Sequence, residues 1–162
     1  MRIILSLAAL LFLASPDAEA KRFFDRPVTI KLTYSNINTG TQTVIAAREV
    51  RLRYSTSENC LQFKNGQYTP AGSNPISYGI HDSVVDLYLY GEGLAFWTSD
   101  MVPAQLQSAW ARILTSYKKG SGRDISMRVA RAQPGAFDKQ LHDSVANESF
   151  HVYIVFGPET EI

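Results

Sequence analysis

The chain has 162 residues, of which 45% are hydrophobic, and its 16 Lys and Arg residues nearly balance its 15 Asp and Glu residues. These values indicate one folded domain, and they exclude both a disordered chain and a protein that binds nucleic acid through bulk positive charge. The only cysteine, Cys60, excludes an intrachain disulfide framework.

The N-terminus has the pattern of an export signal. Met1-Arg2 precedes an apolar run over residues 3–14, and a small-x-small sequence ends at Ala20. A membrane-spanning helix needs about 20 apolar residues, so this run is too short to span. We therefore expect residues 1–20 to be a signal peptide, residues 21–162 to be one globular domain, and the mature protein to be secreted or periplasmic.

The first half of the mature chain has the pattern of β-hairpins. Residues 27–34 alternate between apolar and polar side chains, and so does the end of the run over residues 43–54. A period of two predicts half-buried strands, and the turn-forming residues 35–40 join them into a long hairpin. Asn65-Gly66 marks a second hairpin within residues 61–68.

The middle of the chain is predicted to hold the longest loop and a further hairpin. Residues 70–83 contain two Pro and two Gly among polar residues, which indicates a loop. Residues 84–90 and 94–98 are then expected to pair as strands around Gly91-Glu92-Gly93. In the first of these strands Val85, Leu87 and Leu89 face inward, and Asp86, Tyr88 and Tyr90 face outward.

Two helices are expected near the C-terminal half. Ser99-Asp100 and Pro103 indicate a helix start, and apolar residues continue at helical spacing to Tyr117. Residues 125–130 alternate as a strand. Pro134 then begins a shorter predicted helix with Phe137, Leu141 and Val145 spaced by four, and residues 150–156 form the last strand.

This order of elements predicts an α+β domain, with a mainly antiparallel sheet of about six strands and two helices. An OB-like, partly closed barrel is the alternative. The helix, Gly-rich turn and strand over residues 106–129 resemble an element of secreted OB-fold toxin binding subunits, a resemblance confined to that segment and without a diagnostic motif.

The sequence favours a binding protein over an enzyme. Cys60 has no surrounding residues typical of a nucleophile, and His81, His142 and His151 are too far apart in sequence for a local metal motif. We therefore expect no metal and no cofactor.

A small secreted hydrolase is the enzymatic alternative. A ribonuclease-like reaction uses a His and a Glu as acid and base with an Arg for the phosphate. His151 with Arg51, Arg53 or Arg128, all at polar-facing strand positions, would supply these groups, with Glu49 or Glu92 as the acid–base partner.

Two short sequences also resemble motifs of ADP-ribosyltransferases. Ser55-Thr56-Ser57 resembles the Ser-Thr-Ser element of that family, and Glu159-Thr160-Glu161 resembles its Glu-x-Glu element. The pair departs from the family in its wide separation along the chain and in the position of the Glu pair at the C-terminus, where a rigid support is uncommon.

Aromatic residues on outward positions suggest a binding surface. Tyr and Trp are typical anchors for protein partners or sugar rings. The residues expected to form this face are Tyr88, Tyr90, Trp97, Arg51, Arg53 and Arg128. We expect a host-directed virulence effector or a toxin-associated interaction module with a protein or glycan partner, or alternatively a periplasmic accessory or structural protein.

Asn147 lies in a glycosylation sequon, which has meaning only in a eukaryotic host.

Overall fold

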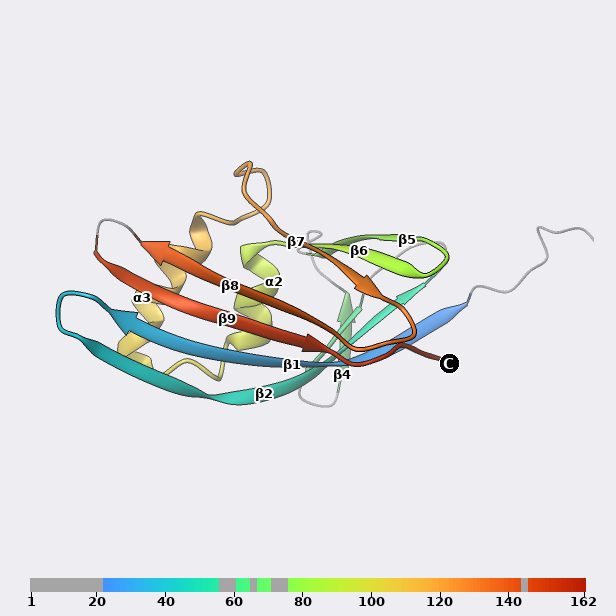
Figure 1. Cartoon of the computed structure of the whole chain (residues 1–162), viewed down its shortest axis with the longest axis horizontal. Coiled ribbons are helices and arrows are strands. Elements are labelled where there is room, and N and C mark those ends of the chain that lie inside the picture. The colour runs from blue at the N-terminus through green and yellow to red at the C-terminus, as the bar shows by residue number, and fades with distance from the viewer. Residues whose placement is uncertain (1–21, 56–60, 65–66, 71–75, 144–145) are drawn as a thin grey trace, which may run out of the picture.

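The computed structural model describes residues 22–55, 61–64, 67–70, 76–143 and 146–162, with side chains described for residues 22–55, 76–143 and 146–162. The predicted signal peptide at residues 1–20, Cys60 and the Asn65-Gly66 turn lie outside the described residues. Within these ranges the chain forms two antiparallel sheets and two helices (Figure 1).

The strands β1 to β4 and β8 to β10 form a seven-stranded main sheet with the order β4-β3-β2-β1-β9-β8, and β10 also pairs with β1. Their bounds are β1 Phe23–Asn36, β2 Thr41–Ser55, β3 Leu61–Lys64, β4 Gln67–Pro70, β8 Gly135–Asp143, β9 Glu148–Phe156 and β10 Thr160–Glu161. The small sheet has the order β5-β6-β7, with β5 Ile76–Ile80, β6 Val84–Leu89 and β7 Ile125–Ala130. The helices are α2 Gly91–Thr98 and α3 Ala104–Thr115.

The core lies between one face of the main sheet and the two helices, which Figure 1 shows on the same side of the sheet. Alternate residues of β1 and β9 are buried on that face, as the period of two requires. Trp110 of α3 packs on Phe150 of β9 with ring centroids 4.6 Å apart, and Tyr34 of β1 packs on the same ring at 5.3 Å. The helical apolar stripe and the strand pattern therefore meet in one core.

These features confirm an α+β domain and exclude a closed barrel. The long hairpin of β1 and β2, the hairpin of β3 and β4, and the strands at residues 125–130 and 150–156 lie where the sequence predicts them. The predicted helix after Pro103 is α3, although Pro103 itself occupies the N-cap position and no capping side chain bonds to the helix.

The prediction of a strand over residues 94–98 was wrong, because these residues belong to α2. Two glycines and several β-forming residues suggested a hairpin, but α2 packs closely on α3. A Cβ atom on Gly91 would lie 2.3 Å from the carbonyl oxygen of Leu114, so only Gly permits this approach. Leu94, Trp97 and Thr98 are buried by the same packing. Tertiary contacts therefore outweigh local propensity here.

The prediction of a helix beginning at Pro134 was also wrong. Residues 135–143 form β8, which pairs with β9 from Gly135 opposite Phe156 to Asp143 opposite Glu148. A spacing of four puts two residues on one face of a strand as well as on one face of a helix. Phe137 and Leu141 thus fit both structures, and pairing with β9 selects the strand.

The expected loop at residues 70–83 contains a strand. Ile76–Ile80 forms β5, which pairs with β6 from Ile76 opposite Leu89 to Ile80 opposite Val85. Gly79 suggested a loop but lies within this strand, opposite Asp86. Of the other described residues of the segment, Pro70 ends β4, and residues 81–83 form the short connection to β6.

Candidate functional site

The outer face of the small sheet holds an exposed tyrosine between small residues. Tyr88, on the central strand β6, is 40% exposed. Its cross-strand neighbours are Ser77 on β5 and Ser126 on β7. Because serine side chains are too short to cover a phenol ring, the ring stands above the sheet. We call the residues of this face the Tyr88 patch: Ser77, His81, Asp86, Tyr88, Ser126 and Arg128.

A hydrogen-bonded cluster borders the tyrosine within the Tyr88 patch. Arg128 donates to both oxygens of Asp86, with Nε at 2.7 Å from Oδ1 and Nη2 at 3.0 Å from Oδ2. The His81 ring reaches the same carboxylate, with Nε2 at 2.9 Å from Oδ2. Gly79, opposite Asp86, has no side chain, and a Cβ there would lie 3.8 Å from the His81 ring. That distance is an ordinary van der Waals contact, so a small side chain at residue 79 would still be compatible with the His81–Asp86 contact.

The cluster fixes the charge of its acid. The hydrogen bond from Arg128 is the main cause that lowers the pKa of Asp86 to about 2, and the His81 contact lowers it further. The Asp86 carboxylate in turn raises the pKa of the Arg128 guanidinium. Both groups are thus ionised at neutral pH, and their charges cancel.

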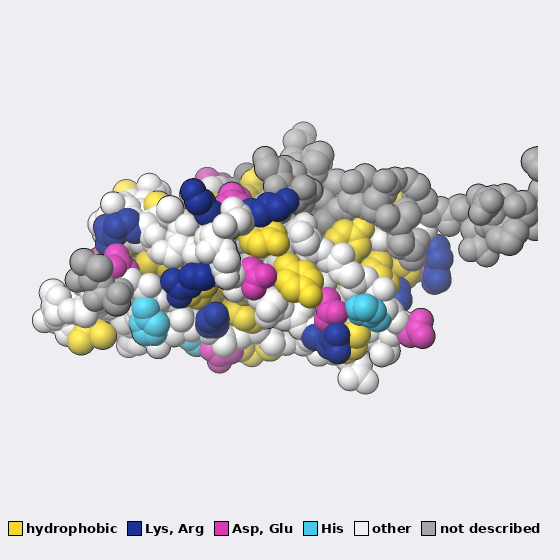
Figure 2. All heavy atoms as spheres, turned by 90° about the horizontal axis from the view of Figure 1, so that it is seen from above, with side chains coloured by type: hydrophobic (Ala, Val, Ile, Leu, Met, Phe, Trp, Pro, Cys, Tyr) yellow, Lys and Arg dark blue, Asp and Glu magenta, His cyan; other side chains and the backbone are white. Residues whose placement is uncertain are grey.

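A shallow, open depression coincides with the Tyr88 patch. It has a volume of about 230 Å³ and is lined by Asp86, Tyr88, Ser126, Met127 and Arg128. Figure 2 views the molecule from above, toward the small sheet, and shows basic, acidic and histidine side chains beside exposed hydrophobic ones. This face can therefore hold one ring-sized group against Tyr88.

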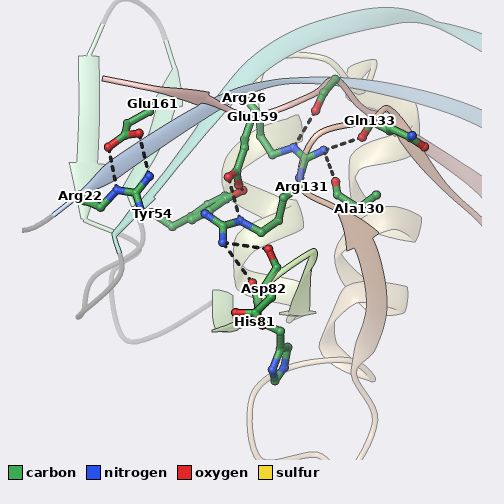
Figure 3. Close-up of polar contacts among 11 residues, drawn as sticks. Arg22, Arg26, Tyr54, His81, Asp82, Ala130, Arg131, Gln133, Glu159 and Glu161 are labelled. Atoms are coloured by element: carbon green, nitrogen blue, oxygen red, sulfur yellow. Dashed lines mark hydrogen bonds and ion pairs between the residues drawn. The ribbon is translucent and has the colours of Figure 1, made fainter.

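A second cluster joins the Tyr88 patch to the main sheet (Figure 3). Arg131, directly after β7, donates from Nε to Glu159 Oε1 at 2.8 Å and from Nη1 to the His81 carbonyl oxygen at 3.1 Å. Tyr54 of β2 donates its hydroxyl to the other oxygen of Glu159. Burial and this hydrogen bond raise the pKa of Tyr54, so it stays protonated. The cluster therefore positions the loop that carries His81.

The segments that resemble ADP-ribosyltransferase motifs meet at this same end of the main sheet. Ser55 follows Tyr54, and Glu161 lies opposite Phe24 on β10, while Thr56 and Ser57 lie outside the described residues. The Glu159 carboxylate is occupied by Arg131 and Tyr54, and Glu161 pairs with Arg22 at 2.8 Å. Both carboxylates thus hold neighbouring segments of the protein together.

Arg26 is a buried cation beside this cluster. It is 0% exposed, and it donates to the carbonyl oxygens of Gly157 at 2.7 Å, Ala130 at 3.1 Å and Gln133 at 3.3 Å. Within the described residues its Nη1 atom has no hydrogen-bond partner. Arg26 therefore holds the β7–β8 connection and the segment after β9 against β1.

The structure separates the predicted aromatic residues. Tyr90 lies half-buried at the N-cap of α2, and Trp97 is 1% exposed in the core. The expectation that Trp97 lies on an exposed strand was wrong, because residue 97 faces inward from a helix that packs on α3. Tyr88 alone of the three is exposed, at 40%.

Arg51 and Arg53 do not join the Tyr88 patch, although Arg128 does. Both arginines lie on β2 of the main sheet, where Arg51 Nε is 2.6 Å and Arg53 Nε is 3.4 Å from the carboxylate of Asp25. Asp25 is 3% exposed, so the arginines compensate a buried negative charge. The expected single surface of arginines and aromatic residues is thus divided between two sheets.

The residues of the hydrolase alternative do not converge. His151 lies opposite Thr33 of β1, whereas Arg51 lies opposite Pro27 and Glu49 opposite Thr29. Measured along β1, His151 is therefore six residues from Arg51, about 20 Å, and four residues from Glu49, about 13 Å. Arg53 is farther along than Arg51, and Arg128 is on the small sheet. The ring of His151 bonds instead to Asp138 of β8.

Asn147 lies in an exposed turn between β8 and β9, with φ of 55°. Asparagine adopts this left-handed region more readily than most residues. Its side chain donates to Asn38 at 3.1 Å. Glycosylation of Asn147 stays a prediction.

Sequence reasoning missed most of the polar part of the Tyr88 patch. The alternation of β6 already placed Asp86 on the same face as Tyr88, but it did not identify the partner of Asp86. The register of β6 against β7 brings Arg128 opposite Asp86, and the connection after β5 brings in His81. Neither the register of β6 against β7 nor the path of the connection after β5 can be predicted from a single sequence.

No protein family matches the chain, and neither a curated protein nor a solved structure matches it significantly. In the part of the chain that the structure describes, no helix is long and apolar enough to cross a membrane. Among the same residues, no three His, Cys, Asp or Glu side chains lie together as a metal site.

Proposed function

We propose that this chain is an exported binding protein whose ligand contacts the Tyr88 patch. The observation that carries the proposal is the exposed ring of Tyr88 beside the Asp86–Arg128 pair. Tyrosine and arginine are enriched among the residues that dominate binding energy, because they combine a large apolar area with polar groups. The rigid support of a three-stranded sheet favours such a site, since little is lost in ordering it.

Export is the second part of the proposal and rests on the N-terminal sequence pattern. An exported binder of this size suits a host-directed effector or a toxin-associated interaction module. A periplasmic accessory protein would use the same surface, and the identity of the ligand separates these roles.

An array of immobilised proteins and glycans tests the binding role. Labelled protein comprising residues 21–162 is applied as wild type, as Tyr88→Ala and as Tyr153→Ala. Tyr153 is a matched control because it is a half-buried tyrosine on the opposite, open face of the main sheet, where Lys31 lies 5.8 Å from its ring centroid.

We expect some immobilised ligands to retain the wild type and Tyr153→Ala but not Tyr88→Ala. Removing a central tyrosine typically costs about 2 kcal/mol or more, a loss of about thirtyfold in affinity. Circular dichroism of the three proteins checks that they are folded. Equal retention of all three, or no retained ligand, would contradict the proposal.

A further inference from the structure

We propose that the ligand of the Tyr88 patch is an uncharged saccharide, whose ring lies against Tyr88 while its hydroxyls bond to the surrounding polar groups. This inference rests on the proposed binding function and adds the chemical class of the ligand. The charge, the hydrogen-bonding groups and the size of the patch each support it.

The charge of the Tyr88 patch favours a neutral ligand. Arg128 is its only strong cation, and two of its nitrogens already bind the carboxylate of Asp86. An anionic ligand would have to compete with a carboxylate that is fully ionised at neutral pH. Ligands such as nucleic acids are bound by an excess of cations instead, and this face has no such excess among its described residues.

The hydrogen-bonding groups of the patch match sugar hydroxyls. In the described part of the chain, no side chain bonds to the hydroxyls of Tyr88, Ser77 or Ser126, each of which can donate and accept. The second terminal nitrogen of Arg128, Nη1, is a further donor that Asp86 does not occupy. Groups that both donate and accept suit the hydroxyls of a saccharide, which do the same.

The apolar part of the patch suits one sugar ring better than a protein surface. Protein interfaces bury a core of several apolar residues, whereas Tyr88 is the most exposed large hydrophobic side chain on the described part of this face, and Met127, which also lines the depression, is half-buried. The others that are exposed lie on β1, on β2, in the turn between them or at the C-terminus, and are Phe23, Ile37, Val44 and Ile162. A tyrosine ring offers a flat apolar face to the C–H groups of a sugar and a hydroxyl at its edge.

The volume of the depression sets the size of the bound unit. At about 230 Å³ it is smaller than the roughly 300–1,000 Å³ of sites for drug-sized molecules. It therefore holds a single saccharide unit, and its open shape leaves room for the rest of a glycan chain. Such a small contact gives weak binding per unit, and we expect dissociation constants on the order of 1 mM. The labelled protein is therefore applied to the array as a multivalent conjugate, whose combined contacts allow retention.

The test uses the glycan half of the array, with neutral oligosaccharides beside sialylated and sulfated ones, followed by NMR titration with the methyl glycoside of the retained neutral sugar. We expect retention on neutral glycans, with saturable amide shifts at Ser77, Asp86, Tyr88 and Ser126. Tyr88→Ala should weaken binding at least tenfold, and Tyr153→Ala should leave it unchanged.

Three outcomes would overturn the saccharide assignment: no retention on neutral glycans, tighter binding to the acidic glycans, or amide shifts on the main sheet. The protein half of the array keeps this failure distinct from failure of the binding function. Retention on proteins that depends on Tyr88, with none on glycans, refutes the saccharide and leaves the Tyr88 patch as a binding surface. Absence of Tyr88-dependent retention on both halves refutes both proposals.

Discussion

The Asp86 carboxylate accepts hydrogen bonds from Arg128 and contacts His81, and it is the centre of the polar part of the Tyr88 patch. Its low pKa means that the pair with Arg128 persists through the physiological range. The folded-state pKa of about 2 lies below the ordinary value of 3.8. The pair therefore stabilises the fold above about pH 4, and this contribution is lost as the pH falls toward 2.

Arg128→Gln should raise the pKa of Asp86 toward its ordinary value, because the principal hydrogen-bond donor and the adjacent positive charge are both removed. A ¹³C NMR titration of the Asp86 carboxyl group measures this shift. Arg123→Gln is the control, since Arg123 contacts Tyr117 rather than Asp86. A wild-type Asp86 that titrates near pH 4 would contradict the described ion pair.

For single residues, the sequence predicted which face of a strand a side chain lies on better than it predicted which residues that side chain contacts. Period-two alternation correctly turned Tyr88 outward and Val85, Leu87 and Leu89 inward. It could not identify Trp97 as a core residue, because that depends on whether residues 91–98 form a helix or a strand. It also could not pair Asp86 with Arg128, since the two are 42 residues apart and only the register joins them.

The elements that sequence reasoning predicted correctly are those with an unambiguous period. β1 and β9 alternate over many residues and β2 over its last residues, while α3 has a continuous apolar stripe that buried Tyr117 follows. β8 was misassigned because apolar residues spaced by four, such as Phe137 and Leu141, lie on one face of a helix and also on one face of a strand. α2 was misassigned because Gly91 permits close packing between helices rather than marking a turn.

Gly91→Ala tests whether α2 and α3 pack so closely that only glycine fits at residue 91. The added Cβ would lie 2.3 Å from the Leu114 carbonyl oxygen, and backbone must move to relieve that contact. Overpacking of this kind typically costs 1–3 kcal/mol, so we expect the free energy of unfolding to fall by about 3 kcal/mol in urea denaturation. Ala95→Ser, at an exposed position of the same helix, should change it by less than about 0.5 kcal/mol. A stable Gly91→Ala variant would show that α2 and α3 are not so closely packed.

In the part of the chain that the structure describes, two arginines join the two sheets: Arg26 is buried and Arg131 is half-buried. Arg131 links the small sheet to Glu159 beyond β9, and its guanidinium lies 4.6 Å from the centre of the Phe24 ring. Arg26 links β1 to the connection after β7. Hydrophobic patterning predicts the α+β class, but nothing in the pattern shows how the two sheets are held, because these contacts join residues far apart in sequence.

Arg131→Gln should destabilise the protein by about 3 kcal/mol, because it leaves the carboxylate of Glu159, whose side chain is only 9% exposed, without its cation. Arg22→Gln is the matched control: the Arg22–Glu161 pair is exposed, with about half of each side chain accessible, and such pairs contribute about 1 kcal/mol at most. Urea denaturation of both variants gives the comparison. Equal losses in the two variants would show that Arg131 is no more important than a surface arginine.

The central claim, that ligands bind at the Tyr88 patch, is tested most directly by one ratio: the array retention of Tyr88→Ala divided by that of Tyr153→Ala on each ligand that retains the wild type. We expect a ratio below about 0.1, corresponding to a loss of more than about 1.4 kcal/mol. A ratio close to one would place the binding surface elsewhere on the molecule and contradict the account.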